Sequence, residues 1–400
     1  MNKELSLRIS KNFLSRGDIN LTTFTSISDS AAKELAKYNG DLYLNGLTTL
    51  SDIAAKALAK HKGWLSLDGL SSLSDSAAEA LAKHKGELSL FGLTSISNKA
   101  ATALSKHKGK FKLSDVASGI IYKRLSYEIA FEYRYYDRNI NLSRFTSIDI
   151  KAAKALSYLD NCENGLDLSG LTSLSKGAAK ELCKQEKDTT IFLSGLTSIS
   201  EEIAAELVKH NATLFLDGLT TIPDEIMKIL ASSSGDLSLN GLTSISDLAA
   251  KALANHNGGI WLDGLTSLSE YAAAALSEPR KWLSLSGLTT LSDKTAKILS
   301  RNKEGLGLEG LISLSDAAAV ALSQVDGWLH LSGLTSLSET AAKALAKQSG
   351  WLTLNGLKSL SNTAVKALAA HKGYLILSET VQPFLNDFKK ETDKFLIKND

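Results

Sequence analysis

A glycine returns about every 23 residues through most of this chain, each time within a pattern close to Leu-x-Leu-x-Gly-Leu. A fixed period of about 20 to 29 residues is typical of solenoids, in which each repeat buries its apolar face against its neighbours. The period therefore argues against the two or three globular domains that 400 residues would otherwise suggest. The glycines are Gly46, Gly69, Gly92, Gly170, Gly195, Gly218, Gly241, Gly264, Gly287, Gly310, Gly333 and Gly356.

Four degenerate repeats continue the count without a glycine, and their slot holds Thr23, Asp115, Arg144 and Glu379. With them, about sixteen repeats cover residues 18–381. We expect residues 1–17 to cap one end of the array and residues 382–400 to form a capping helix at the other. In the first cap, Leu5, Leu7 and Ile9 alternate as in a strand. In the second, helical spacing relates Val381, Phe384, Leu385, Phe388, Phe395 and Leu396.

Each repeat reads as a strand, a turn and a short helix. Residues 65–67 alternate apolar and polar side chains, and Gly69 allows the chain to turn. Residues 74–82 have alanines and leucine on one helical face, with Ser74 suited to cap the helix N-terminus. Gly86 is suited to a left-handed turn after the helix.

Stacked repeats would place their strands about 4.8 Å apart in one parallel sheet. Their helices need about 8–10 Å between axes. A layer that is wider on its helix side must bend. The repeat therefore predicts an α/β solenoid, a curved array with one continuous parallel sheet on the concave face and short helices on the convex face.

The units resemble a bacterial type of leucine-rich repeat, with Leu-x-Leu-x-Gly-Leu-Thr-x-Leu-Ser-x-x-Ala-Ala-x-x-Leu as the local form. The resemblance covers about nine-tenths of the chain and implies a scaffold for binding. Many such repeats carry an asparagine ladder after the strand, whereas leucine occupies that slot here, as at Leu70. We expect the Thr-Ser pair that follows to satisfy the backbone of the turn instead.

Residues 115–145 form an irregular, enlarged repeat, because 29 residues separate Asp115 from Arg144. Ile121, Leu125 and Ile129 are spaced as on one face of an amphipathic helix longer than its neighbours. The segment is also rich in tyrosine. It is either a decayed repeat whose bulky residues fill a packing gap or a secondary contact surface made of Tyr122, Tyr127, Tyr133, Tyr135 and Tyr136.

Each strand has three outward slots: the first precedes its first inward apolar residue, the second lies between its two inward residues, and the third follows them. All five tryptophans fall in outward slots of the concave sheet. Rings gathered on an exposed face mark a contact site, although ladders that only stabilise the sheet remain an alternative. The candidate ligand-binding residues are Trp64, Trp261, Trp282, Trp328, Trp351, Tyr374, Phe192, Phe215 and His330. Asp217, Asp263, Glu309, Thr353 and Asn355 could add hydrogen bonds to a partner.

Histidine shares one slot of the back turn in six repeats, at His61, His84, His107, His210, His256 and His371. No accompanying carboxylate or cysteine motif favours a metal, so we interpret these residues as cations at helix ends. Cys162 and Cys183 are expected to be two free thiols. We find no nucleophile elbow, phosphate-cradling loop or zinc motif, and no segment outside the repeats is long enough for a catalytic domain. The expectation is a protein that is no enzyme and has no cofactor.

The charge balance, with 45 basic and 43 acidic residues, does not favour nucleic acid. No apolar run is long enough to insert in a membrane, and no secretory signal is recognisable. We therefore expect a monomer that is cytoplasmic in the producing cell or secreted without a classical signal. The predicted function is recognition of a protein or peptide partner through the aromatic concave face, for which contact between a bacterium and a host is one setting. A glycan-binding module and a structural spacer are the alternatives.

Overall fold

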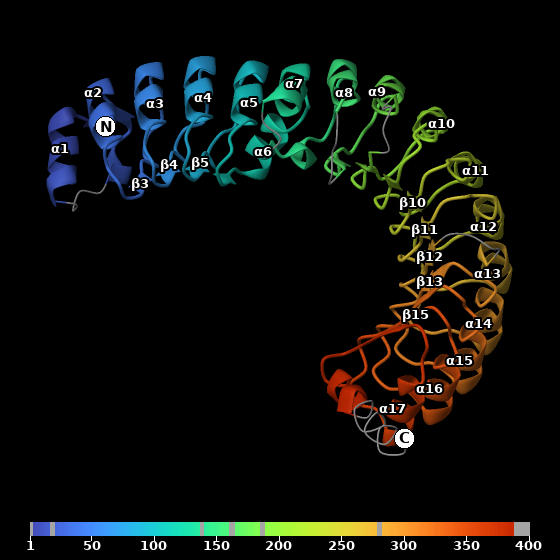
Figure 1. Ribbon diagram of the computed structural model, residues 1–400. Helices are drawn as coiled ribbons and strands as arrows, with labels where there is room; N and C mark the ends of the chain where they lie inside the picture. Colours follow the sequence, from blue (N-terminus) through green and yellow to red (C-terminus); the bar gives the residue numbers. More distant parts are fainter. Residues whose placement is uncertain are drawn as a thin grey trace. The chain divides into compact units, whose positions relative to one another are not determined.

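The computed structural model describes residues 3–16, 21–136, 140–159, 165–184, 189–277 and 282–387 (Figure 1). The chain forms two compact units, Met1–Leu156 and Ser157–Asp400, called here the first and second unit. In both units short strands alternate with short helices. The predicted α/β solenoid is confirmed.

The second unit contains ten strands and the helices between them. The strands are β7 (Leu166–Asp167), β8 (Ile191–Phe192), β9 (Leu214–Phe215), β10 (Leu237–Ser238), β11 (Ile260–Trp261), β12 (Trp282–Ser284), β13 (Gly305–Gly307), β14 (Trp328–His330), β15 (Trp351–Leu354) and β16 (Tyr374–Leu377). The helices are α9 (Lys176–Leu182), α10 (Glu201–Leu207), α11 (Asp224–Leu230), α12 (Asp247–Leu253), α13 (Glu270–Leu276), α14 (Asp293–Leu299), α15 (Asp316–Leu322), α16 (Glu339–Leu345) and α17 (Asn362–Ala369).

These ten strands form one parallel sheet in sequence order, each paired with the next. Within the second unit, Figure 1 shows the strands along the inner side of a curve and the helices along its outer side. The register is uniform, because residues in the same slot pair directly, as Trp328 does with Trp351 and Trp351 with Tyr374. Side chains in one slot therefore form a column across the sheet.

The first unit follows the same plan with more irregularity. Its strands are β1 (Glu4–Leu5), β2 (Ser26–Ile27), β3 (Leu42–Tyr43), β4 (Leu65–Ser66), β5 (Leu88–Ser89) and β6 (Phe111–Lys112). Its helices are α1 (Leu7–Arg16), α2 (Asp29–Leu35), α3 (Asp52–Leu58), α4 (Asp75–Leu81), α5 (Asn98–Leu104), α6 (Asp115–Ile121), α7 (Tyr127–Tyr135) and α8 (Ile150–Leu156). Two 3₁₀ turns, η1 (Leu21–Thr23) and η2 (Leu142–Arg144), stand in the degenerate repeats that have Thr23 and Arg144 in the glycine slot.

The continuous sheet expected from the sequence is interrupted. In the first unit, β1 pairs with β2 and β3–β6 form a separate parallel sheet. Between Lys112 and Leu156, the described residues contain no strand beyond an isolated bridge between Leu125 and Ile148. The enlarged repeat therefore ends the regular sheet of this unit.

The enlarged repeat holds two helices where one longer helix was predicted. Ile121 ends α6, Leu125 forms the bridge, and Ile129 lies in α7. All three are buried, so their apolar spacing reflects burial by separate elements rather than one helical face. Ser126 occupies the helix-start position before α7, which makes α7 the regular helix of this repeat and α6 the insertion.

The predicted strand at the N-terminus is also wrong in part. Leu5 belongs to β1, but Leu7 and Ile9 lie in α1, a ten-residue helix. At the other end, residues 382–387 are helical, and Val381 and Leu385 are buried. The expected capping residues from Phe388 onward lie outside the described residues.

In several repeats the serine that caps the helix also links neighbouring repeats. The hydroxyl of Ser74 accepts the backbone N–H of Ala77 at 3.0 Å, as predicted, and donates to the carboxylate of Asp52 in the preceding helix. The same arrangement joins Ser246 to Asp224 and Ser269 to Asp247, at 2.5 and 2.6 Å. One side chain thus satisfies a free helix N–H and holds two repeats in register.

Three of the back-turn histidines form a buried column. His61, His84 and His107 are at most 4% exposed and stack with ring centroids 6.1 and 6.3 Å apart. Burial lowers the pKa of His61, and the charge of His84 lowers it further. Burial likewise lowers the pKa of His107. The prediction that these two residues are helix-end cations is therefore wrong, because the fold favours their neutral form.

We expect the first unit to lose stability as the pH falls below about 6.5, the ordinary histidine pKa, towards the lowered pKa values of His61 and His107. In this window the unfolded chain binds more protons than the folded one, so the free energy of unfolding decreases as the pH falls. Glutamine should preserve the packing, since Gln348 in the same slot donates to the carbonyl of Gly327 at 2.7 Å. The variant H61Q/H107Q should flatten the dependence of Tm on pH between pH 7.5 and 5. An acid shift as large as that of the unsubstituted protein would contradict this explanation.

Candidate functional site

Three exposed rings of the second unit lie together on the C-terminal strands of its sheet. Trp328, Trp351 and Tyr374 hold the first outward slot of β14, β15 and β16 and are 46%, 37% and 66% exposed. Their ring centroids lie 4.8 Å apart for the two tryptophans and 4.4 Å apart for Trp351 and Tyr374. The tryptophan planes differ by only 8°, so these rings stack face to face. We call Trp328, Trp351 and Tyr374 the aromatic column.

Trp282 of β12 lies beside the aromatic column and next to β13, whose first two outward slots hold glycine. Its ring centroid is 6.3 Å from that of Trp328, and the two planes meet at 79°. A Cβ at Gly305 would lie 2.7 Å from the Trp282 ring, and one at Gly307 would lie 3.0 Å from it. The indole therefore lies over β13, in space that only two glycines leave open.

The glycine pair was not identified from the sequence, although a signal was present. Gly305-Leu306-Gly307 is the repeat in which glycine holds both the first and the second outward slot. Glycine inside a strand weakens it and often marks a place where another group approaches the backbone closely. Here the approaching group is Trp282 from the preceding strand.

A polar cluster adjoins these rings. Nδ1 of His330 lies 3.0 Å from Oε1 of Glu309, and the hydroxyl of Ser286 donates to Oε2 of the same carboxylate. Burial alone would raise the pKa of Glu309, but the hydrogen bonds from His330 and Ser286 outweigh it and hold the pKa below its ordinary value. Glu309 is thus a charged acceptor at neutral pH. The His330 ring that binds it has its centroid 5.1 Å from that of Trp282.

A second aromatic group lies at the other end of the same sheet. Phe192 and Phe215 stack with centroids 4.5 Å apart, and Phe215 is 6.5 Å from Trp261. The small side chain of Ser238 occupies the second slot of the strand between Phe215 and Trp261. The structure therefore places these three predicted residues in one row, about half-buried, along the second slot.

Trp64 is separate from the others, because it belongs to the first unit. Its ring contacts Tyr43 edge-on at 5.1 Å, and the ammonium of Lys112 lies 4.0 Å from the Trp64 ring centroid. Lys112 also pairs with Glu87 at 3.1 Å. The open face of Trp64 is therefore already occupied by a lysine of the same chain.

Polar side chains in the third slot bind the neighbouring repeat. Oδ1 of Asp217 accepts the backbone N–H of Asn240 at 2.9 Å, and Oδ1 of Asn240 accepts that of Asp263 at 2.8 Å. Oδ1 of Asp263 in turn accepts the N–H of Ser286 at 2.8 Å. The turn backbone is thus satisfied by a ladder of aspartate and asparagine two residues before the leucine that replaces the usual asparagine, and not by Thr-Ser pairs alone. These side-chain oxygens therefore already accept hydrogen bonds from the backbone of the next repeat.

The tyrosine-rich helix α7 carries a small exposed cluster. Phe131 lies 4.6 Å from Tyr135, 5.8 Å from Tyr127 and 6.1 Å from Tyr136, between ring centroids. Tyr122 does not belong to this surface, contrary to the prediction. It is 6% exposed, packs edge-on against Phe145 and accepts a hydrogen bond from Arg144 at 3.1 Å.

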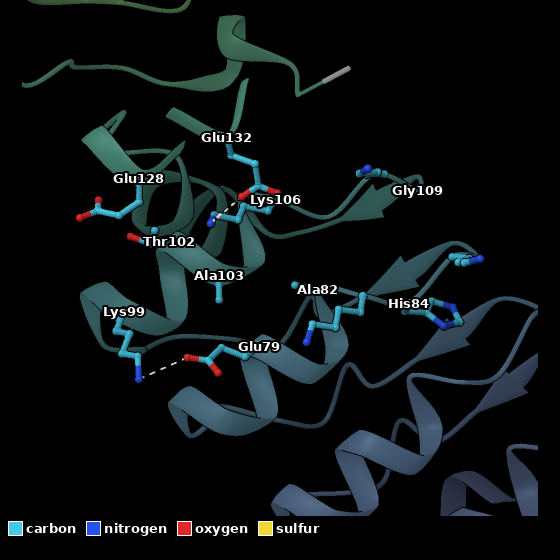
Figure 2. A pocket seen from close by; sticks show the side chains of 13 residues that line it. Glu79, Ala82, His84, Lys99, Thr102, Ala103, Lys106, Gly109, Glu128 and Glu132 are labelled. Carbon is cyan, nitrogen blue, oxygen red and sulfur yellow. Dashed lines mark ion pairs between the residues drawn. The ribbon is translucent and has the colours of Figure 1, made fainter. Parts of the chain in front are cut away.

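A cavity of about 850 Å³ lies on the helix side of the first unit, between α4, α5 and α7 (Figure 2). Ion pairs cross its wall, from Lys99 to Glu79 at 3.2 Å and from Lys106 to Glu132 at 2.7 Å. These charges largely neutralise one another. Within the described ranges, no cluster of three or more histidine, cysteine or carboxylate side chains could hold a metal ion.

The cysteine in the described part of the chain, Cys183, is buried and not disposed to react as a thiolate. Burial raises the pKa of Cys183 to about 12, so its thiol stays protonated at neutral pH. Cys162 lies outside the described residues. In the part of the chain that the structure describes, no helix has both the length and the apolar composition to cross a bilayer.

No family model and no curated protein matches the sequence. Solved structures resemble it weakly. A leucine-rich-repeat protein of Leptospira interrogans aligns with 90% of this chain and 95% of its own, at 19% identity and a TM-score of 0.32. Internalin inlF of Listeria monocytogenes aligns with 86% of this chain and with 88% of its own chain, at 16% identity and a TM-score of 0.37. The TLR13–ssRNA13 complex aligns with 90% of this chain and with 58% of its own chain, at 17% identity and a TM-score of 0.38. Similarity at this level assigns neither partner nor activity.

Proposed function

We propose that this chain, whose repeats resemble leucine-rich repeats, is a non-enzymatic scaffold that binds a protein or peptide on the strand face of its second unit. The observation that carries the proposal is the aromatic column. Three large rings stand on adjacent strands and keep between about a third and two-thirds of their surface in water. Exposed rings of this size cost free energy unless a partner covers them.

Two alternatives account less well for the column. A ladder that only stabilises the sheet explains the stacking, but it does not require the rings to remain this exposed. A glycan would stack on open ring faces. Because Trp328, Trp351 and Tyr374 already stack on one another, the column mostly offers ring edges and indole N–H donors. Edges and donors suit the apolar side chains and carbonyl groups of a peptide.

We expect the variant W328A/W351A to lose partner capture by about thirtyfold or more, because truncating central interface tryptophans typically costs at least about 2 kcal/mol. The measurement is a pull-down from candidate proteomes, with far-UV circular dichroism to verify the fold. W64A in the first unit is the matched control and should capture normally. If W328A/W351A captured the same proteins as the unsubstituted chain, the column would not be the binding surface. Binding of the chain to a glycan array, without capture of any protein, would favour the glycan alternative.

A further inference from the structure

The strand face of the second unit is acidic as well as aromatic. Across the three outward slots of its ten strands there is neither lysine nor arginine, although the whole chain has 45 basic residues. His330 is the only base in these slots. The acidic residues of the slots are Asp167, Asp217, Asp236, Asp263 and Glu309. On the corresponding sheet of the first unit, by contrast, Lys110 holds the first outward slot and Lys112 the second outward slot of β6.

The first unit shows how these repeats accommodate a cation. Trp64 holds the first slot of β4, Glu87 the first slot of β5, and Lys112 the second slot of β6. The Lys112 ammonium sits 4.0 Å from the Trp64 ring centroid and 3.1 Å from a Glu87 oxygen. A cation held between a ring face and a carboxylate is favourable because both present negative potential.

The second unit has a related arrangement, in which His330 takes the place of the lysine and pairs with the carboxylate. Trp282, Gly305 and His330 stand in the slots that Trp64, Glu87 and Lys112 hold in the first unit. The carboxylate is retained in a different slot, as Glu309 in the third slot, just after β13. When Nδ1 of His330 donates to Glu309, its Nε2 is a further acceptor. Ring, carboxylate and acceptor are present, and lysine is not.

We propose that the strand face of the second unit binds a basic peptide segment, with an arginine or lysine side chain of the partner seated beside Trp282, His330 and Glu309. This inference rests on the proposed function and names the chemistry of its partner. Arginine fits best, since its planar guanidinium can lie along a ring and donate to a carboxylate at the same time. The five carboxylates would repel phosphates, which makes nucleic acid an unsuitable occupant of this face.

The test uses the full chain and three fluorescein-labelled nonapeptides that alternate glycine with arginine, lysine or glutamate. Fluorescence anisotropy at physiological salt should show saturable binding of the arginine peptide, weaker binding of the lysine peptide and none of the glutamate peptide. Raising the salt concentration should weaken the arginine complex, as expected for charge pairs at an accessible surface. Equal binding of the arginine and glutamate peptides, or no binding of the arginine peptide, would overturn the proposal.

Three variants locate the site. E309Q keeps the shape of the side chain and should weaken the arginine peptide about tenfold, a loss typical of removing one close charge partner. E225Q makes the same charge change on the exposed helix α11, where Glu225 pairs with Lys228, and should leave affinity unchanged. H330K supplies the lysine that the first unit carries in this slot. The lysine that H330K introduces should occupy the cation site with a side chain of the same protein and so abolish binding of the arginine peptide.

The outcomes separate this inference from the proposed function. If W328A/W351A loses its captured partner while E309Q and H330K bind the arginine peptide as well as the unsubstituted chain, the face binds a partner but not through a cation at this site. If E225Q weakens binding as much as E309Q, the effect is one of net charge, and the assigned site is wrong.

Discussion

Replacing Gly264 with alanine should lower the free energy of unfolding of the second unit by about 3 kcal/mol or more. A Cβ at this position would lie 2.2 Å from the carbonyl oxygen of Asn240 and 2.6 Å from that of Leu242. Both oxygens belong to the backbone of the preceding repeat, so no side chain can rotate away. The two repeats would have to separate, which disturbs the sheet between β10 and β11.

Urea unfolding followed by tryptophan fluorescence measures this effect, because Trp261, Trp282, Trp328 and Trp351 all lie in the second unit. Gly119 provides the matched control. It lies within α6, and a Cβ there would meet no atom within 4 Å. G119A should therefore stabilise the first unit by about 0.5–1 kcal/mol through helix propensity. A G264A protein as stable as the unsubstituted chain would show that the repeats are not packed this closely.

The period, the strand, the cap and the helix of the regular repeats could be predicted, because they depend on residues close together in the sequence. Ser74 caps its helix as its spacing indicated. The reason for the repeated glycine was different from the one expected. Gly86 and Gly69 have no left-handed backbone angle, and among the described glycines only Gly165 does, at a φ of 74°. The glycines are required by the backbone of the preceding repeat, a contact that one repeat read alone does not contain.

Features that depend on contacts between repeats were predicted less well. The neutral His61 results from burial beneath its neighbours and from stacking on His84, whereas its position in one repeat suggested a helix-end cation. The slots of the tryptophans followed from alternation along each strand, and the structure finds Trp328 and Trp351 exposed there. The place of Trp282 did not follow, because it depends on two glycines in the next repeat. Whether these rings bind a partner stays a prediction.

Replacing Leu253 with alanine should destabilise the second unit by about 3 kcal/mol, within the range typical of leucine-to-alanine changes at buried sites. Leu253 ends α12 and is 0% exposed, so truncation removes apolar contacts and leaves a cavity. The same substitution at Leu248, in the same helix but 58% exposed, should change the free energy of unfolding by less than about 0.5 kcal/mol. Urea unfolding of both variants compares them directly. Because helix propensity changes equally in the two, their difference measures burial alone, and equal losses would mean that α12 does not pack on the sheet through the face that bears Leu253.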